Sequence, residues 1–564
     1  MRLFGADRAA RLPLLLAMLW FAGCSSDGSD NLSGQTTADA GADENTPVHV
    51  AFAGGGWRAH TAHAGWLMSL LDDGAYTVND VFDNVETLSS NSGGTWFLSM
   101  LTYSADFRAS VEGPGAFANF ISPQGYLGQQ RALFDDFEAA PVAFNWCPFQ
   151  QSEPLLYFYC RLASLAGSGA LVWTEIVNNI VFEPFGMNRA LEQSPTLLSS
   201  DRQNWAADKS LLIAATMLTD QAILTETYTL DELYYTAVLS GSGPQQQNVT
   251  PVTFASVGSD RTPPPVLSAG AFKLTYKDAD GGDSAEAEVM NSELSADNVP
   301  VLLATAASSA AVGALASYSV LEANGYDDFT WQLAYELSDL AVPVKLGAPI
   351  TAAGELPLTV HELAASTFAR FADGGYQDNS AVAQLVSFLQ PNDAGAAFQL
   401  VAFDNVQELY TAPSGTIPAG AEMGLDIALL FGEGGQTQVC AGTGSDEFCV
   451  SVPAQQVFAL AAPDTTTPAT WSWTAEGATG PTLSYTQYEV VTVDNPTLGV
   501  VGGTQGTLHA FTCVWPTADT APWNGASDFD AYEAMLNAIR TGLQADNSEG
   551  LQHLRDALSG TGSL

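Results

Sequence analysis

Two glycine-containing segments near the start of the chain have the residue types needed for acyl transfer. Gly54-Gly55-Gly56-Trp57-Arg58-Ala59 comes first, and Ser92-Gly93-Gly94-Thr95-Trp96 follows it. Glycine lets backbone N–H groups approach a ligand closely, and free N–H groups at the start of a helix suit a developing negative charge. A serine on a sharp turn from strand to helix exposes its hydroxyl as a nucleophile. The segments therefore predict oxyanion-binding N–H groups and a nucleophile.

The elements around these segments would bring them to one pocket. An apolar, strand-like run at 48–53 precedes the first segment, a second such run at 82–88 precedes the other, and a helix-like stretch follows each. Successive parallel strands joined by a helix place both turns at the same sheet edge. Glycine-rich turns also bind dinucleotide phosphates, but this one lacks the G-x-G-x-x-G spacing. An ordinary loop is the remaining alternative.

A serine hydroxyl needs a base to take its proton, and the chain offers two candidates. His509 lies in Thr507-Leu508-His509-Ala510-Phe511. Asp373 begins Asp373-Gly374-Gly375-Tyr376-Gln377-Asp378-Asn379 after a short apolar run, where two glycines leave space around its side chain. Asp-Gly-Gly is also a common structural turn, so the residues alone leave both candidates open.

Taken together, the segments resemble one family. GGGWRA at 54–59, SGGTWFLSML at 92–101 and DGGYQDN at 373–379 have the order and context of a known catalytic domain. That domain is shared by cytosolic phospholipase A2 and fungal phospholipase B (lysophospholipase), within the patatin-like superfamily. The segment 249–259 resembles a further family motif of Thr-Pro-x-x-Phe type, and 400–404 fits the strand after the aspartate. The resemblance spans roughly 48–405.

The resemblance implies a patatin-like α/β fold, with a central mostly parallel sheet flanked by helices, and a Ser–Asp dyad without histidine. Ser92 would be the nucleophile and Asp373 its base. The oxyanion hole would use the glycine run Gly54–Gly56 together with Gly93, and Arg58 would serve the substrate phosphate or the transition state. Neither a cofactor nor a metal is implied. The family's Gly-Leu-Ser is Ser90-Asn91-Ser92 here, which leaves room for a less strained turn.

The N-terminal residues are typical of an export signal. Three arginines precede a short apolar run at 12–21, and Ala22-Gly23-Cys24 follows it. This arrangement resembles the lipobox of bacterial lipoproteins, in which the processed cysteine is acylated, although Phe21 stands where leucine is usual. An ordinary signal peptide is the alternative. We expect a signal peptide at 1–23, lipidation of Cys24, a flexible tether at 24–46 and a single catalytic domain at 47–564. The protein would then be lipid-anchored in the cell envelope, at the outer membrane, or exported.

Composition narrows the classes of partner. The chain has 62 acidic and 17 basic residues, which gives a net charge of −45. This balance excludes nucleic acid as a main partner, because phosphate binding needs clustered Lys and Arg. Five cysteines follow Cys24, and Cys147 with Cys160 and Cys440 with Cys449 suggest two short-loop disulfides. His60 and His63 are interpreted as a helix-surface pair and not as metal ligands.

The order of elements along the chain indicates an α/β protein. Strand-like runs alternate with helical stretches, the runs being 48–53, 82–88, 211–217, 398–403, 457–461 and 488–493. Residues 105–205 are rich in aromatic residues without a period and would cap the sheet, form a lid over an apolar site or be irregular core. Residues 408–485 and 500–525 are rich in Gly, Pro and Thr, which predicts loops and hairpins.

The function expected from these observations is hydrolysis of fatty-acyl esters in phospholipids or lysophospholipids through an acyl-enzyme. A general carboxylesterase or an acyltransferase stays open, since another alcohol could resolve the acyl-enzyme. A third possibility is an inert surface lipoprotein that binds lipid or protein, for which the altered turn before Ser92 is the support.

Overall fold

The computed structural model describes residues 47–560 with gaps. The longer gaps are 136–153, 188–196, 224–234, 241–248, 263–271, 290–298, 317–339, 354–367 and 462–469. The expected signal peptide, Cys24 and the tether lie outside the described residues, so they stay predictions.

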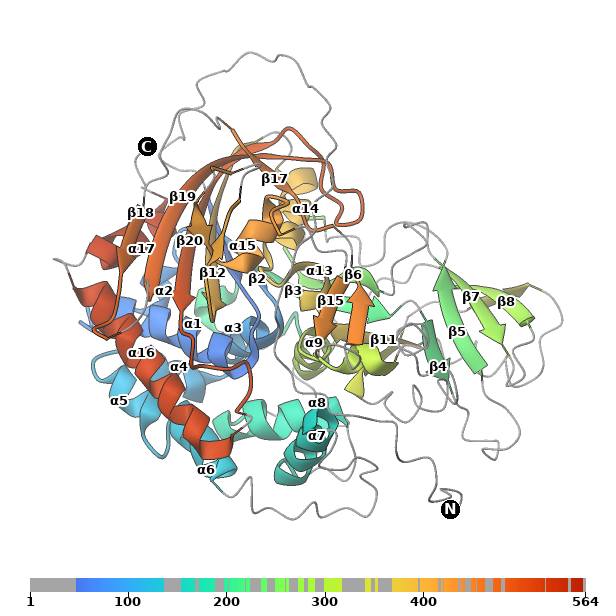
Figure 1. The fold of residues 1–564 in the computed structure, drawn as a ribbon, viewed down its shortest axis with the longest axis horizontal. Helices are drawn as coiled ribbons and strands as arrows, with labels where there is room; N and C mark the ends of the chain where they lie inside the picture. The colour runs from blue at the N-terminus through green and yellow to red at the C-terminus, as the bar shows by residue number, and fades with distance from the viewer. Residues whose placement is uncertain are drawn as a thin grey trace.

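A large mixed sheet forms the centre of the molecule (Figure 1). Its five middle strands are parallel and follow the order β20 (Gln505–Val514), β12 (Phe398–Val406), β1 (Val48–Phe52), β2 (Val85–Ser90) and β3 (Ser210–Leu218). Every residue of β1, β12 and β3 is buried. Strands covered on both faces read as continuous apolar runs, which is why these were visible in the sequence. The predicted α/β class with a parallel central sheet is confirmed.

The edges of the sheet are antiparallel. Beyond β20 come β19 (Leu483–Thr492), β17 (Phe458–Leu460) and β18 (Thr470–Trp473). Beyond β3 come β6 (Val249–Ser256), β11 (Phe368–Asp373) and β9 (Val342–Lys345). The strand β11 is the important one for the site, because it runs against β3 and ends at Asp373.

Helices cover both faces of the sheet. Side chains alternate across β12, so Val401 and Phe403 join one hydrophobic core while Leu400 and Ala402 join the other. The first core is covered by α1 (Gly56–Leu71), α3 (Ser92–Tyr103), α16 (Asp528–Gln544) and α17 (Glu549–Ser559). The second is covered by α14 (Val382–Asn392) and α15 (Leu425–Leu430). The sheet is therefore the middle layer of three.

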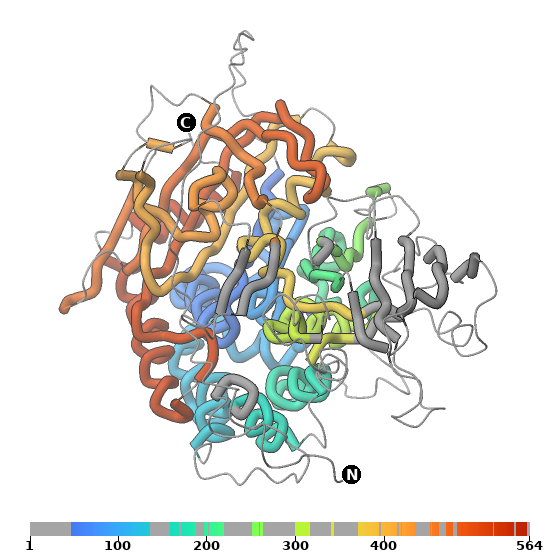
Figure 2. The backbone as a smooth tube through the Cα atoms, turned by 45° about the vertical axis from the view of Figure 1, so that its right-hand side comes forward, coloured from blue at the N-terminus to red at the C-terminus, as the bar shows by residue number. Residues whose placement is uncertain are grey.

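The described part of the region 105–205 is mainly helical. Its helices are α4 (Ala105–Val111), α5 (Ala116–Ile121), α6 (Tyr126–Phe134), α7 (Pro154–Leu165) and α8 (Trp173–Val177). Figures 1 and 2 show α16, from the C-terminal part of the chain, beside α5 and α6, and the three are in contact. Buried aromatic residues such as Phe107, Phe120 and Tyr126 join these helices to the main core. Of the three predictions for this region, core packing is the one that the described helices fit.

The C-terminal part of the chain differs from the sequence prediction. Residues 500–525 were expected to form loops and hairpins, yet β20 is a central strand paired with β12 and β19 along its length. Threonine, glycine and histidine interrupt the apolar pattern of this strand, which hid it. A separate antiparallel sheet follows the order β10 (Ile350–Ala353), β8 (Asp283–Val289), β7 (Phe272–Lys277), β5 (Tyr235–Ser240) and β4 (Asp220–Ile223). That residues 47–564 form a single domain stays a prediction.

The cysteines can be placed in part. Cys160 is disulfide-bonded, and Cys147, its predicted partner, lies outside the described residues. In the hairpin of β15 (Gln438–Ala441) and β16 (Phe448–Ser451), Cys440 is directly opposite Cys449, which fits the second predicted pair. Cys513 is buried and free. Among the described helices, none combines the length and the apolar character needed to cross a membrane.

Candidate active site

Ser92 lies on a strained turn between β2 and α3. The strand ends at Ser90, Asn91 is extended, and Ser92 has a φ of 48° as the first residue of the helix. The left-handed region is costly for a residue with a Cβ, so such a conformation persists only where its surroundings hold it. The Ser92 N–H donates to Ser308 Oγ at 3.0 Å, and Thr95 Oγ1 donates to Ser90 Oγ at 3.0 Å. The turn is strained although Ser90 replaces the expected glycine.

The two glycine segments are in direct backbone contact. A Cβ added at Gly93 would lie 2.2 Å from the Gly56 carbonyl oxygen, and one at Gly94 would lie 2.3 Å from the Phe52 carbonyl oxygen. A Cβ at Gly54 would lie 3.0 Å from the Cβ of Ser92. The prediction that the two turns meet at one edge of the sheet is therefore confirmed.

Asp373 reaches Ser92 from the opposite strand direction. Along β3, Ser90 of β2 pairs with Ile213 and Asp373 of β11 pairs with Ala215. The strands β2 and β11 run in opposite directions, and both end close to the same level along β3, within two residues of each other. Ser92 Oγ donates to Asp373 Oδ2 at 2.7 Å, while the Gly375 N–H donates to Oδ1 at 2.8 Å. One carboxylate oxygen holds the nucleophile and the other fixes the carboxylate.

The environment of Asp373 suits a base that works near neutral pH. Burial raises the pKa of this carboxyl to about 6, against the lowering effect of the hydrogen bonds from Gly375 and Ser92. A catalytic base is most effective when its pKa lies near the working pH. Asp373 is 7% exposed and Ser92 is 8% exposed, so both members of the pair are buried.

The histidines are placed elsewhere. His509 lies on β20 with its Nδ1 3.0 Å from the Tyr485 hydroxyl, and burial lowers its pKa to about 4. The Ser92 hydroxyl bonds to Asp373 and not to this ring. His60 and His63 are both buried, so their interpretation as a surface pair is wrong. His63 Nε2 donates to the Ala53 carbonyl at 2.9 Å and so supports the strand end before the glycines.

The three glycines of the first segment have different roles. The Gly54 N–H donates to the Asn379 carbonyl at 2.8 Å, so it is already used. Gly55, with a φ of 125°, and Gly56, with a φ of 56°, form the start of α1. Within the described part of the chain, no protein acceptor is bonded to the N–H groups of Gly55, Gly56 and Gly93. These three N–H groups are therefore free to bind an acceptor, as an oxyanion hole would require, whereas the Gly54 N–H is not.

Arg58 is a buried cation beside the glycines. Its Nε donates to Asn405 Oδ1 at 3.2 Å and its Nη1 to the Ala518 carbonyl at 3.3 Å. Burial lowers the pKa of this guanidinium, and the nearby carboxyl groups of Asp426, Asp404 and Asp519 oppose that effect. Its Nη2 lies 3.3 Å from the position that a Cβ on Gly55 would take. A fixed positive group thus stands next to the oxyanion donors.

Several supporting residues were not predicted from the sequence. Asn379 and Asn405 hold the two sides of Gly54, since Asn405 Nδ2 donates to the Gly54 carbonyl at 3.2 Å. Ser308 supports the Ser92 N–H from a distant helix, α9 (Val301–Ser308). Asn379 belongs to the DGGYQDN motif and Asn405 follows the strand recognised at 400–404, so their motifs were noticed but their contacts were not. Such contacts depend on tertiary packing, which spacing does not reveal.

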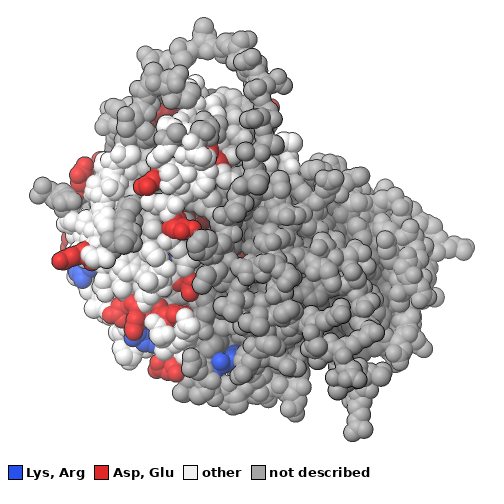
Figure 3. Space-filling view, in the orientation of Figure 1, with Lys and Arg blue, Asp and Glu red and all other residues white. Residues whose placement is uncertain are grey.

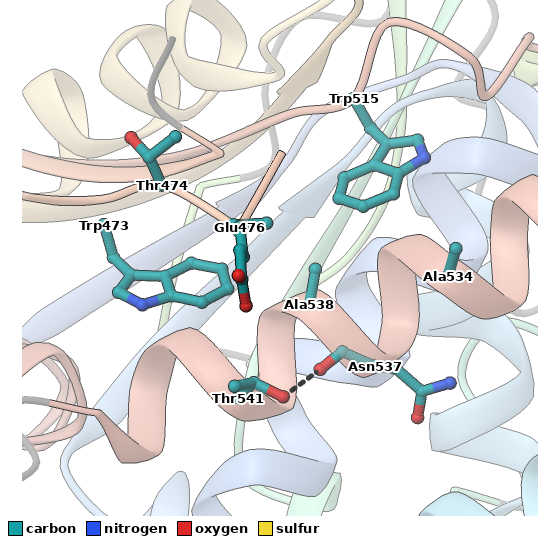
Figure 4. A pocket seen from close by; sticks show the side chains of 9 residues that line it. Trp473, Thr474, Glu476, Trp515, Ala534, Asn537, Ala538 and Thr541 are labelled. Atoms are coloured by element: carbon teal, nitrogen blue, oxygen red, sulfur yellow. Dashed lines mark hydrogen bonds between the residues drawn. The ribbon is translucent and has the colours of Figure 1, made fainter. Parts of the chain in front are cut away.

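A separate open groove of about 540 Å³ lies between the β18 end and α16 (Figure 4). It is lined by Trp473, Thr474, Ala475, Glu476, Trp515, Ala534, Asn537, Ala538 and Thr541. The chain continues from Trp515 to Ala518 and Thr520, whose carbonyls accept from Arg58 and from the Trp57 N–H. The segment Trp515–Ala521 therefore connects this groove to the glycine turn. No cluster of three or more side chains able to hold a metal ion is found among the described residues.

Comparison with known proteins gives a distant likeness. No protein-family model and no curated protein sequence matches the chain. Among solved structures the chain is similar to human GIVD cytosolic phospholipase A2, with 12% identity and a TM-score of 0.31. The match covers 93% of this chain and 64% of that one, so the chain spans less than two thirds of its length. A likeness of this degree carries no argument about the site, whose interpretation rests on its own geometry.

Proposed function

We propose that the protein is a serine acyl hydrolase that cleaves fatty-acyl esters of phospholipids or lysophospholipids. One observation carries the proposal: Ser92 Oγ, on a strained turn at the start of a helix, donates to a buried carboxylate at 2.7 Å. The turn and the bond together match what an activated serine nucleophile requires.

The proposed reaction has two halves. Ser92 Oγ attacks the ester carbonyl carbon while its proton passes to Asp373, and the carbonyl oxygen becomes an oxyanion held by the N–H groups of Gly55, Gly56 and Gly93. As the tetrahedral intermediate collapses, Asp373 gives the proton to the leaving alcohol and Ser92 remains acylated. Asp373 then takes a proton from water as the water attacks the acyl carbon, and it gives that proton to Ser92 Oγ as the fatty acid leaves, which restores both side chains.

Arg58 supports a phosphate-bearing substrate in this proposal. A guanidinium keeps its positive charge and holds its N–H donors in a fixed plane, which a lysine does not. Two of its nitrogens already hold Asn405 and Ala518, so Nη2 would be the group that faces the substrate. The acidic surface, visible in Figure 3 as more Asp and Glu than Lys and Arg, gives little attraction to anionic lipid headgroups.

We also propose that Cys24 is the site of a lipid anchor that keeps the catalytic part at a membrane. Two or three acyl chains hold a protein stably where one is marginal, since each buried CH₂ adds about 0.8 kcal/mol. Fractionation of wild type and Cys24→Ala, with radiolabelled palmitate, tests this. Labelled Cys24→Ala protein, or a wild type found wholly in the soluble fraction, would contradict the anchor.

The function itself is tested with a fluorophosphonate probe and a panel of lipids. The probe should label Ser92 in the wild type and give no label in Ser92→Ala. Hydrolysis should be faster on phospholipid or lysophospholipid than on triglyceride or short neutral esters. Labelling without lipid hydrolysis would favour a general carboxylesterase, and no labelling at all would favour an inert binding protein.

A further inference from the structure

One residue of the site makes contact with all three catalytic segments. Asn379 follows the short helix α13 (Gly375–Asp378), which comes directly after the Asp373 turn. Its carbonyl accepts from the Gly54 N–H at 2.8 Å, and its Oδ1 accepts from Asn91 Nδ2 at 3.1 Å. Its Nδ2 donates to Asp426 Oδ2 at 2.6 Å. Asn379 thus joins the base turn, the glycine turn and the residue before the nucleophile.

The space around this side chain is closely filled. A Cβ added at Gly54 would lie 2.1 Å from Asn379 Oδ1, and one added at Gly375 would lie 3.0 Å from the same atom. The amide oxygen therefore occupies the space that both glycines leave open. A longer side chain would displace the glycine turn, and a shorter one would leave Asn91 without its acceptor.

The amide chemistry of Asn379 is also required by its neighbours. Asp426 is half-buried on α15 and accepts from Nδ2, whereas Asn91 Nδ2 needs an acceptor. A single side chain must accept on one side and donate on the other, and at this length only asparagine does both. Asp426 in turn lies close to Arg58, whose charge it balances.

From these contacts we propose that Asn379 is a positioning residue, which holds the oxyanion donors in register with Ser92. The inference rests on the proposed function. Its loss should affect the transition state more than substrate binding, because the oxyanion exists only after Ser92 has attacked. Misplacement of a catalytic group by about 1 Å can cost about 10²-fold in rate.

The test is a swap of hydrogen-bonding groups. Asn379→Asp keeps the acceptor for Asn91 but places a carboxylate against Asp426, so kcat on a soluble p-nitrophenyl ester should fall about 10²-fold with little change in KM. Adding Asp426→Asn gives the pair its donor back with the direction reversed. The double variant should therefore recover at least about tenfold in kcat, which a double-mutant cycle measures as coupling.

Asn495→Asp is the matched control. Asn495 is buried, and its Nδ2 donates to the carbonyls of Ala454 and Gln456, outside the site. It should lower the unfolding temperature as Asn379→Asp does, yet leave kcat within about twofold. Asn91→Ala removes the side chain that donates to Asn379 Oδ1. If Asn379→Asp does not fold, the kcat of Asn91→Ala tests the positioning role instead.

The outcomes separate the inference from the function it rests on. If fluorophosphonate does not label Ser92 in the wild type, the proposed function fails. If the wild type is labelled and active, wild-type kcat in Asn379→Asp or in Asn91→Ala overturns only the positioning role. An unchanged kcat deficit in the double variant also overturns it, because the swapped pair should restore the contact.

Discussion

The Ser92 hydroxyl lies 2.7 Å from Asp373 Oδ2, although 281 residues separate the two in the chain. Neither side chain reaches the other through a flexible loop, since each is at the end of a strand paired with β3. The register of these strands sets the distance between the Ser92 hydroxyl and the Asp373 carboxylate. The pair is therefore built into the middle of the fold, which makes it a suitable first target for mutation.

Loss of either member of the pair should abolish hydrolysis. Ser92→Ala and Asp373→Asn should each lower kcat/KM by about 10³-fold or more, because nucleophile and base act as one unit. His509→Ala is the matched control, since this ring bonds to Tyr485 and should affect stability only. The measurement is the rate of ester hydrolysis by the three variants. Severe inactivation of His509→Ala alone would contradict a Ser92–Asp373 dyad.

The pH dependence of activity should follow Asp373. Its pKa of about 6 means that the carboxyl is protonated, and unable to take the Ser92 proton, at lower pH. We expect kcat/KM on a neutral ester to rise tenfold per pH unit below about 6 and to level off above it. A profile that stays flat down to pH 4 would show that Asp373 is not the base.

The same carboxyl should make the wild type less stable than Asp373→Asn as pH rises. The pKa is higher in the folded protein, about 6, than the ordinary 3.8, so the folded state binds the proton more tightly. This stabilising contribution is complete below about pH 4 and is lost as pH rises through 6. Asn does not titrate, so the advantage of Asp373→Asn in unfolding temperature should grow between pH 4 and 7. A constant difference would contradict the raised pKa.

Gly56→Ala should inactivate the protein. A Cβ at Gly56 would lie 2.1 Å from the Thr520 carbonyl oxygen, in addition to the cost of a positive φ. Gly113→Ala is the matched control, because Gly113 has a φ of 88° and no atom within 4 Å of an added Cβ. Both variants should lose about 1 kcal/mol of folding free energy through backbone strain, and only Gly56→Ala should also show a lower kcat. Equal activity in the two would remove Gly56 from the oxyanion hole.

Arg58→Lys should separate phosphate recognition from catalysis. Lysine keeps a positive charge but loses the planar set of donors, so the loss in kcat/KM should be at least about tenfold larger on phospholipid than on a p-nitrophenyl ester. The contacts with Asn405 and Ala518 also weaken, which thermal unfolding measures separately. Equal losses on both substrates would assign Arg58 a structural role or one toward the oxyanion.

Short motifs predicted the residues of the site better than the way in which they are held. The glycine turn, Ser92 and Asp373 could be picked out because each follows a strand-like run, and the structure brings all three together. The hydrogen bond of the Gly54 N–H could not be predicted, because its acceptor, the Asn379 carbonyl, is 325 positions away and no sequence pattern marks it. The burial of His60 and His63 was also hidden, since it depends on aromatic neighbours such as Tyr126, which stacks on His60.

The position of β20 shows the same limit for the fold. This strand lies between β12 and β19, but its own sequence alternates apolar residues with threonine and histidine. Its place in the parallel part of the sheet depends on pairing with β12, a strand about a hundred residues earlier, as in the pairing of Leu400 with Leu508. Pairing over such distances is a property of the whole chain, which local propensity does not contain.

The carbonyls of Ala518 and Thr520 have a consequence for the order in which the protein is made. Arg58 and Trp57 are among the first folded residues to leave the ribosome, but their acceptors come from a segment that follows β20. Domains generally fold as units during synthesis, so this one cannot complete its packing before the segment after β20 has been made. A nascent chain could therefore hold both Ser92 and Asp373 while the glycine turn still lacks its support. Catalytic competence would then arrive late, as a single step, once the last strand of the parallel core has joined the sheet.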